Sequence, residues 1–298
     1  MFTVVIPLYN KESTIEETLK SVLNQTVSNF DIIVVNDGST DRSREHAARL
    51  TDSRIKIFDQ SNKGISAARN LAIRHSPSPY IATLDADDIW LPEYLEEQTR
   101  MITDFPEAKM WGTAWDSFGI QKRYSRDHGL DSAFRGYVDD YFTMNKKGHL
   151  FLPSATVVER QAISDVGLYD ENIRTGEDLD LYFRMLLQYR AAFCNNPLML
   201  FNTGIPNRHT KRATPIHYWY FYNMKKYEVD RRENPVFRKY FDHLVLLYMY
   251  SYRLNGQFGD QVDEILTHID FTLQPRRWRW LYKFPSAYKL YRKVRQKP

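Results

Sequence analysis

The amino-acid sequence predicts an α/β protein with a mostly parallel central sheet, followed by a helical region at the C-terminus. In the first third of the chain, uniformly apolar segments of strand length alternate with amphipathic segments of helix length. This order favours right-handed strand–helix–strand units. A cluster of carboxylates ends one of these strands, at the kind of sheet edge where ligands bind in open α/β sheets. The last third of the chain reads as helices rich in aromatic residues.

Four strands are predicted in this part of the chain, and the first is too uniformly apolar to be half exposed, which indicates that it is buried in a mostly parallel sheet. They are expected at Phe2–Leu8, Phe30–Val35, Ile55–Phe58 and Tyr80–Leu84. Helices are expected between them. A capping box at Ser13–Glu16 predicts the start of the first helix. Gly64 opens a later one, and Pro92 precedes a helix that runs to about Asp104.

The pattern changes after this helix, and the remaining elements are mixed. Further strands are expected at Met110–Phe118, Ser154–Val158 and Ala191–Phe201. A helix is expected to begin at Gly176 with acidic residues in its first turn, where the helix dipole favours them. Three helices are expected in the last third, at His217–Tyr227, Val236–Leu254 and Phe258–Ile269.

Three carboxylates stand within four positions where the fourth predicted strand ends: Asp85, Asp87 and Asp88. Asp85 and Asp87 are two residues apart, so their side chains would share a face of an extended strand. Carboxylate, phosphate and water oxygens are the ligands that Mg²⁺ and Mn²⁺ prefer. The cluster therefore predicts a divalent-metal site that leaves ligand positions for a diphosphate. The alternative is that these acids cap the helix after Pro92 and face water.

Composition and missing motifs exclude several classes of protein. The 298 residues are 43% hydrophobic and 26% charged, as in an ordinary folded protein. No apolar run is long enough for a transmembrane helix. No basic segment precedes the strand pattern at Phe2, so we expect no signal peptide. The single cysteine, Cys194, cannot form a disulfide within the chain, which fits a reducing compartment. No glycine-rich dinucleotide fingerprint follows the first strand, so neither NAD nor FAD is expected.

Four motifs occur in order along the first part of the chain, and the ordered set is far more specific than any single motif. They are Val4-Val-Ile-Pro7-Leu-Tyr9-Asn10, Val34-Val-Asn-Asp37-Gly-Ser-Thr-Asp41, Asn62-Lys-Gly-Ile-Ser-Ala-Ala-Arg69-Asn70 and Leu84-Asp85-Ala-Asp87-Asp88. Together they closely resemble the family 2 glycosyltransferases with a GT-A fold. Glu177-Asp178 resembles the later acidic pair of that family. The resemblance covers roughly residues 1 to 215.

This resemblance implies a fold and an activity. The fold is a nucleotide-binding α/β/α sandwich of the GT-A type over residues 1–215, followed by a helical region at 216–298. The activity is the transfer of a sugar from a nucleotide-diphospho-sugar, expected to be a UDP-sugar, with inversion at the anomeric carbon. The expected cofactor is a divalent metal, Mn²⁺ or Mg²⁺. The expected acceptor is a glycan or a lipid-linked glycan used in surface polysaccharide synthesis.

Site residues are carried over only onto positions that match the family's motifs. Those expected to bind the nucleotide-sugar are Pro7 and Tyr9 at the base pocket, Asp37 at the uracil edge, Asn62 and Arg69 near the uridine or diphosphate, Asp85 and Ala86 of the acid motif, and Arg208. The expected metal ligands are Asp87, Asp85 and His209. Asp178 is expected to be the catalytic base, although its neighbour Glu177 remains an alternative for that role.

The C-terminal tail, Phe271–Pro298, contains no acidic residue and interleaves basic with aromatic side chains. Lys and Arg together with Trp and Tyr suit an anionic membrane surface. We therefore expect a cytoplasmic protein that attaches peripherally to the inner face of the cell membrane. The alternative is that the aromatic residues pack onto the catalytic domain while the charges are merely solvated. Nucleic acid is not an expected partner, because the tail is short and carries no known binding motif.

Two other functions compete with glycosyl transfer. A sugar-nucleotide nucleotidyltransferase can share a similar nucleotide-binding half, but such enzymes usually carry a glycine-rich loop after the first strand. Here Pro7-Leu-Tyr-Asn-Lys-Glu offers no glycine. The second alternative is a non-catalytic, membrane-associated scaffold that has kept the fold. The presence of Asp85, Asp87 and Asp178 favours an intact enzyme over a scaffold.

Overall fold

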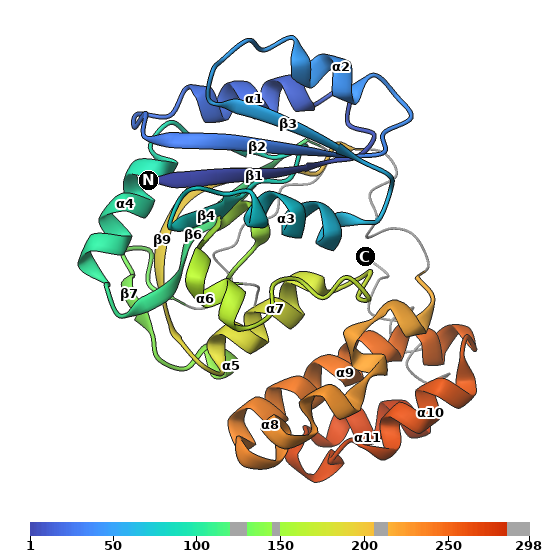
Figure 1. Ribbon diagram of the computed structural model, residues 1–298. Coiled ribbons are helices and arrows are strands. Elements are labelled where there is room, and N and C mark those ends of the chain that lie inside the picture. Colours follow the sequence, from blue (N-terminus) through green and yellow to red (C-terminus); the bar gives the residue numbers. More distant parts are fainter. Residues whose placement is uncertain (120–129, 145–149, 206–213, 285–298) are drawn as a thin grey trace, which may run out of the picture. The chain divides into compact units, whose positions relative to one another are not determined.

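The computed structural model describes residues 1–119, 130–144, 150–205 and 214–284. The chain divides into two compact units, Met1–Ala213 and Thr214–Pro298, and each is described by itself (Figure 1). No helix among the described residues is both long enough and apolar enough to cross a bilayer.

The first unit is built around one nine-stranded sheet. Its strands are β1 (Phe2–Leu8), β2 (Phe30–Asp37), β3 (Ile55–Gln60), β4 (Tyr80–Thr83), β5 (Ile89–Trp90), β6 (Ala108–Phe118), β7 (Arg135–Val138), β8 (Thr156–Glu159) and β9 (Arg190–Asn202). They lie in the order β3-β2-β1-β4-β8-β6-β9-β5, with β7 paired to β9.

Most strands of the sheet run in one direction. The pairs β2–β3, β1–β2 and β1–β4 are parallel, as the alternation of strands and helices predicts. Strand β8 is antiparallel to both β4 and β6, so β6 and its parallel neighbour β9 run the same way as β1. Strands β5 and β7 run antiparallel to β9. The predicted mostly parallel α/β fold is therefore confirmed, with short reversed strands added after β4.

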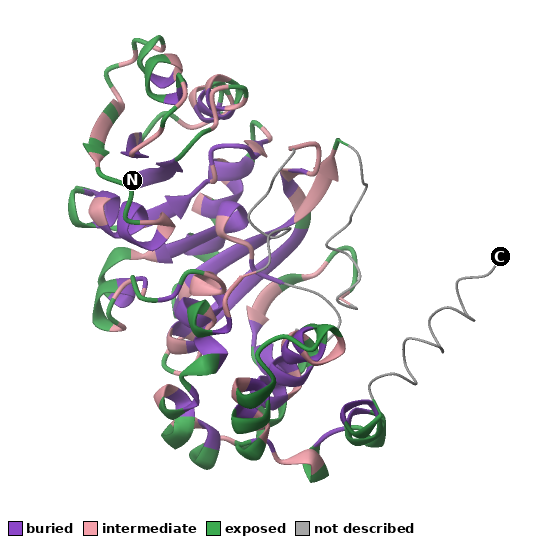
Figure 2. Ribbon diagram, turned by 90° about the vertical axis from the view of Figure 1, so that its right-hand side faces the viewer, coloured by how far each residue is buried: buried purple, intermediate pink, exposed green. Residues whose placement is uncertain are grey.

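Seven helices belong to the described part of this unit. They are α1 (Ile15–Leu23), α2 (Ser43–Ala48), α3 (Ile65–Arg74), α4 (Tyr94–Asp104), α5 (Tyr141–Met144), α6 (Arg160–Asp165) and α7 (Glu177–Leu186). Helices α1 and α2 lie on one side of β1, β2 and β3, and α3 lies on the other (Figure 1). This layering buries both faces of the central strands, and Figure 2 shows those strands as buried.

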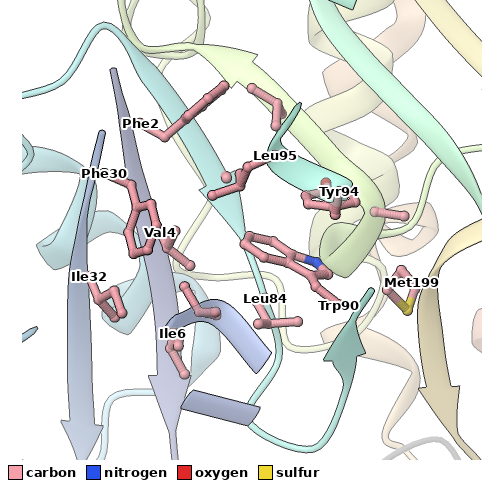
Figure 3. Packing of buried hydrophobic residues seen from close by; sticks show 14 of the residues in the cluster. Phe2, Val4, Ile6, Phe30, Ile32, Leu84, Trp90, Tyr94, Leu95 and Met199 are labelled. Atoms are coloured by element: carbon pink, nitrogen blue, oxygen red, sulfur yellow. The ribbon is translucent and has the colours of Figure 1, made fainter. Parts of the chain in front are cut away.

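The apolar core explains why these strands need no polar face. All seven residues of β1 are buried, so this central strand is covered on both sides. On one side Val4 and Ile6 belong to the same cluster as Leu84 and Trp90 (Figure 3). The Trp90 ring stacks on Tyr94 at a centroid distance of 4.2 Å, which joins the end of β5 to the start of α4.

The second unit is helical and its central helix has clear end signals. It contains α8 (Glu228–Glu233), α9 (Pro235–Asn255), α10 (Gly259–Thr267) and α11 (Arg276–Lys283). The side chain of Asn234 caps α9 by accepting a hydrogen bond from the Phe237 backbone N–H at 2.9 Å, and Pro235 occupies the first turn. Gly256 ends the helix in the left-handed region, with φ 66°.

The predicted helix at His217–Tyr227 is wrong. That segment forms three short 3₁₀ turns, at Ile216–Tyr218, Tyr220–Tyr222 and Met224–Tyr227. Neighbouring aromatic residues Tyr220 and Phe221 are both buried, and both rings lie near Phe241 of α9. Two adjacent positions of an α-helix face directions about 100° apart, so local aromatic packing has overridden the helical pattern.

Candidate active site

The loops that carry the sequence motifs follow β1, β2, β3 and β4 at the carboxyl edge of the sheet. Asn10, after β1, has a left-handed backbone with φ 52°. Its side-chain oxygen accepts a hydrogen bond from the Thr40 backbone N–H after β2, at 2.8 Å. Pro7 is buried in β1, whereas Tyr9 is 39% exposed at the strand's end. The loop that Asp37 begins therefore lies against the loop that carries Tyr9.

Asp37 holds the neighbouring loop rather than facing water. Its side chain is buried and accepts hydrogen bonds from the backbone N–H groups of Lys63 and Gly64, both at 2.8 Å. The Gln60 side chain donates a third, at 2.7 Å. A carboxylate has about four acceptor positions, so one position remains for a ligand. Asn62 is exposed in the loop that Asp37 anchors.

Arg69 joins two acidic groups that are far apart in the sequence. It lies on α3 with a side chain only 1% exposed. One terminal nitrogen donates to Asp85 Oδ1 at 2.8 Å, and the other donates to Glu177 Oε1 at 3.0 Å. The guanidinium also lies 5.1 Å from the centroid of the Tyr169 ring. One buried cation therefore connects the acid motif after β4 to the acidic pair that starts α7.

The next residue, Asn70, holds the segment that leads to α7. Its side-chain nitrogen donates to the Tyr169 backbone oxygen at 2.8 Å, and its side-chain oxygen accepts from the Tyr169 backbone N–H at 3.0 Å. The same nitrogen donates to Glu171 at 2.9 Å. Asn70 is itself buried. The pair Arg69-Asn70 thus positions both the side chains at the start of α7 and the backbone before it.

The three acids of the motif occupy different surroundings. Asp85 is partly exposed and paired with Arg69, whereas Asp87 and Asp88 are buried. Asp87 Oδ2 forms an ion pair with Lys11 Nζ at 2.6 Å. Burial, together with the neighbouring charges of Asp87 and Asp85, raises the pKa of Asp88 to about 8. The alternative in which the acids merely cap the following helix and face water is wrong, because Asp87 and Asp88 are buried and the N-cap position of α4 falls on Glu93.

Asp88 and Ser154 fix the conformation of the acid motif. The Ser154 hydroxyl donates to Asp88 Oδ2 at 2.7 Å and accepts from the Asp85 backbone N–H at 3.1 Å. Asp88 Oδ1 accepts from the Asn202 backbone N–H at 3.1 Å. The motif after β4 is therefore tied to the segment before β8 and to the end of β9. Sequence reasoning gave Ser154 no role, because no spacing rule relates it to the motif.

Helix α1 supports the acid motif through Thr14, the residue after the expected cap Ser13. Thr14 is the N-cap residue of α1, but its hydroxyl makes no capping hydrogen bond. Instead it donates to the backbone oxygen of Ala86 at 2.8 Å. The predicted capping box at Ser13–Glu16 is wrong, because Thr14 and not Ser13 occupies the N-cap position, and the Thr14 hydroxyl contacts Ala86 instead of capping the helix. Thr18, one turn later, donates to the Asp88 backbone oxygen at 2.9 Å.

The acidic pair at the start of α7 has two distinct members. Glu177 is paired with Arg69 and has a side chain only 13% exposed. Its pKa is raised to about 7, because burial and the charge of Asp178 outweigh the opposing charge of Arg69. Asp178 is partly exposed and makes no ion pair within the ranges that the structure describes. Its Oδ1 accepts only the adjacent Leu179 N–H, at 2.9 Å. Asp178 is therefore the more available carboxylate.

The structure brings most of the predicted site residues to one edge of the sheet. Arg208 and His209 lie outside the described residues. Within the described ranges, no three His, Cys, Asp or Glu side chains cluster closely enough to hold a metal ion by themselves. Asp85 and Asp87 supply hard carboxylate oxygens, and Asp87 already pairs with a cationic group. The donor chemistry thus fits a divalent cation that takes its other ligands from elsewhere.

The fold and the motif-bearing loops define an α/β protein of the GT-A type. Residues 3–167 match the family model described as glycosyl transferase family 2. The chain belongs to this family, which confirms the resemblance of the four motifs.

Several known proteins are similar to the chain. An uncharacterized glycosyltransferase of Rickettsia conorii is 33% identical over 60% of this chain, and the match spans 29% of that protein's length. An Escherichia coli UDP-Glc:alpha-D-GlcNAc-diphosphoundecaprenol beta-1,3-glucosyltransferase is 37% identical over 38% of this chain and 45% of its own. A putative teichuronic acid biosynthesis glycosyltransferase of Bacillus subtilis is 26% identical over 78% of this chain and 89% of its own.

A solved structure supports the fold over nearly the whole chain. The crystal structure of S. aureus TarS 1-349 in complex with UDP-GlcNAc aligns with a TM-score of 0.75. The alignment covers 94% of this chain and 83% of that TarS 1-349 chain, at 15% sequence identity. At this identity the likeness concerns the fold alone.

Proposed function

We propose that this chain is an inverting glycosyltransferase that moves a sugar from a UDP-sugar to a glycan or lipid-linked acceptor. We assign catalysis to the unit that contains the sheet. The observation that carries the proposal is the buried Arg69, which joins Asp85 of the acid motif to Glu177 of the pair on α7. This arrangement suits a reaction in which a diphosphate and a general base must act on opposite sides of one sugar carbon.

The names of two similar proteins guide the choice of donor and acceptor. The E. coli relative is named for a UDP-Glc donor and a diphosphoundecaprenol-linked acceptor. The TarS structure contains UDP-GlcNAc. We propose UDP as the nucleotide here as well, with Pro7 and Tyr9 beside the base and Asp37 accepting from its edge. In this proposal Asn62 and Arg208 approach the uridine or diphosphate.

In the proposed reaction, Asp178 acts as the base and Glu177 positions Arg69. The acceptor hydroxyl oxygen bonds to the anomeric carbon while the bond from that carbon to the diphosphate oxygen breaks. The hydroxyl proton passes to Asp178, and the nucleoside diphosphate leaves with the bonding electrons. An ordinary Asp has a pKa of about 3.9 and is a weak base, so positioning supplies much of the rate enhancement.

We propose that the metal is Mn²⁺ or Mg²⁺ and that Asp85 and Asp87 hold it. His209 is proposed as a further ligand, and Ala86, between the two acids, is proposed to face the donor. When bound, such an ion neutralises the charge that develops on the leaving diphosphate. Since the described residues alone form no complete ligand set, the remaining ligands would include diphosphate oxygens and water.

The reaction can be tested by incubating the protein with a panel of UDP-sugars and measuring release of UDP. We expect release with at least one donor, and loss of about a hundredfold or more in rate for Asp178→Asn. The matched control is Glu45→Gln, which changes an exposed carboxylate on α2. In a second assay with UTP and a sugar 1-phosphate, release of pyrophosphate would instead indicate a nucleotidyltransferase. A folded protein without any release would favour the scaffold.

We also propose that the C-terminal unit attaches the enzyme to the cytoplasmic face of an anionic membrane through α11. Trp278 and Tyr282 face inward: Trp278 Nε1 donates to His243 at 3.2 Å, and the Tyr282 hydroxyl donates to the Leu246 backbone oxygen at 2.6 Å. These two aromatic residues therefore pack on α9 of their own unit. The alternative, in which the aromatic residues of the tail pack onto the catalytic domain, therefore does not account for the contacts of Trp278 and Tyr282 with α9.

The outer face of α11 has a different character. Trp280 and Phe284 are 46% and 48% exposed, and their ring centroids lie 6.3 Å apart. They line an open groove together with basic side chains, namely Arg276, Arg279 and Lys283. Exposed aromatic rings beside cations suit the interface of an anionic bilayer. No acidic residue occurs between Phe271 and Pro298 to oppose this attraction.

Co-sedimentation with liposomes tests the attachment. We expect the wild-type protein to pellet with phosphatidylglycerol vesicles and not with phosphatidylcholine vesicles. Replacing Trp280 and Phe284 by Ser should reduce pelleting, while the control Val229→Ser, which changes a residue 53% exposed on α8, should not. Equal, negligible pelleting of all these proteins would contradict the proposal.

A further inference from the structure

Lys11 reaches the acid motif from the loop after β1. Its ammonium lies 2.6 Å from Asp87 Oδ2. The backbone of Lys11 is fixed on both sides of the residue, because its N–H donates to the Ser43 hydroxyl at 2.6 Å and its carbonyl accepts from the Ile15 N–H at 3.0 Å. The side chain is therefore aimed at Asp87 by an anchored piece of chain, and the contact does not depend on a mobile loop.

Within the ranges that the structure describes, Arg69 and Lys11 are basic partners of the acid motif, and they differ in how firmly they are held. Arg69 is 1% exposed, and two different carboxylates hold its guanidinium. Lys11 has a side chain 26% exposed, and its ammonium is a compact charge at the end of a flexible stem. Breaking the Arg69 pairs would leave a buried cation uncompensated, whereas the Lys11 ammonium can turn into water. Only the Lys11 pair is thus suited to open during each turnover.

We propose that Lys11 is a positioning residue that competes with the divalent cation for Asp87. This inference rests on the proposed function, in which Asp87 is a metal ligand. A cation that arrives alone must displace the ammonium and gains only carboxylate oxygens. A cation that arrives with the donor gains diphosphate oxygens as well, and the released ammonium gains an anionic partner. Lys11 therefore makes metal binding depend on the donor, which is a coupling between the two ligands.

The test measures Mn²⁺ binding by titration calorimetry, with and without UDP, and needs no activity. Lys11→Met keeps most of the stem and removes the charge. It should bind Mn²⁺ alone about fivefold more tightly than the wild-type protein, the effect expected for a partly exposed ion pair. UDP should then improve Mn²⁺ affinity less than it does in the wild-type protein. The control is Lys20→Met, which removes an ammonium that is 58% exposed on α1 and should change neither affinity.

A gain in affinity cannot result from a damaged fold, so the expected outcome is specific. Lys11→Gln serves as a second variant if Lys11→Met does not fold. Unchanged or weaker Mn²⁺ binding by the folded variant, alongside measurable binding by the wild-type protein, would overturn the inference and leave the metal site in place. Absence of Mn²⁺ binding by the wild-type protein even with UDP would remove the proposed metal site, and this inference with it.

Discussion

Replacing Arg69 by Met tests the connection between the acid motif and α7. The substitution removes a buried cation and leaves Asp85 and Glu177 without it. Removing one partner of a buried pair costs about 3 to 5 kcal/mol in the free energy of unfolding. Asp85 is 31% exposed, so water can replace part of the hydrogen bonding that it loses with Arg69. Glu177 is only 13% exposed, so water replaces less of its lost hydrogen bond. We therefore expect the free energy of unfolding, measured in urea, to fall by about 3 kcal/mol, the lower end of that range.

The loss should depend on pH, because Glu177 has a raised pKa of about 7 in the folded protein against 4.5 as its ordinary value. Below pH 4.5 this group is protonated in both states and does not affect stability. As the pH rises, the unfolded chain releases the proton first, so stability falls until the folded pKa is passed. Without Arg69 that pKa rises further, and the fall continues to higher pH. The difference between variant and wild type should therefore be larger at pH 8 than at pH 5.5.

The matched control for this experiment is Arg184→Met on α7, the helix that carries Glu177. Arg184 forms an ion pair with the fully buried Asp180 at 2.7 Å, away from the acid motif. Its replacement should also destabilise the protein, but it should leave UDP affinity unchanged, whereas Arg69→Met should weaken it. A loss below about 1 kcal/mol for Arg69→Met, or an equal loss at both pH values, would refute the reasoning.

Three further substitutions test the contacts around the site. Asn70→Ala leaves the backbone N–H and carbonyl of Tyr169 without their partner and should cost about 2 to 3 kcal/mol in urea unfolding; a loss within error of zero would contradict this role. Ser154→Ala removes the hydroxyl that donates to Asp88 and should cost about 1 to 3 kcal/mol, with weaker Mn²⁺ binding in the presence of UDP; unchanged binding would mean that the motif holds its shape alone. Gly64→Ala places a Cβ 2.1 Å from a guanidinium nitrogen at a residue with φ +96°, so UDP affinity measured by calorimetry should fall; an unchanged affinity would show that this loop does not help to bind the nucleotide.

Much of the fold follows from local patterns in the sequence. The strand Phe2–Leu8 is predicted with the bounds that the structure gives, because an uninterrupted apolar run followed by a polar loop leaves little choice. Gly64 is correctly expected to open a helix, since its positive φ suits the position before α3. The helix expected at His217–Tyr227 fails because aromatic side chains at adjacent positions find partners on the same neighbouring helix.

The site could be predicted only as separate motifs, because its connections are long-range. Sequence order places Asp85 and Glu177 on different elements, and no periodicity indicates that Arg69 touches both. The contact of Lys11 with Asp87 spans 76 positions along the chain. The hydrogen bond from Thr14 to Ala86 spans 72 positions, and the local capping box expected at Ser13 does not indicate it. Such contacts are set by how α1, α3 and α7 pack on the sheet, which residue spacing does not record.

The most direct measurement of the central claim is thermal unfolding of the full chain with UDP, GDP, CMP and ADP, each with and without Mn²⁺. A ligand at about 100 times its dissociation constant stabilises the folded state by about 2.7 kcal/mol, which gives a visible shift. We expect a shift with UDP that requires Mn²⁺ and disappears in Asp87→Ala. A folded sample that responds to none of the nucleotides would contradict the proposal that this sheet edge binds a nucleotide-diphospho-sugar.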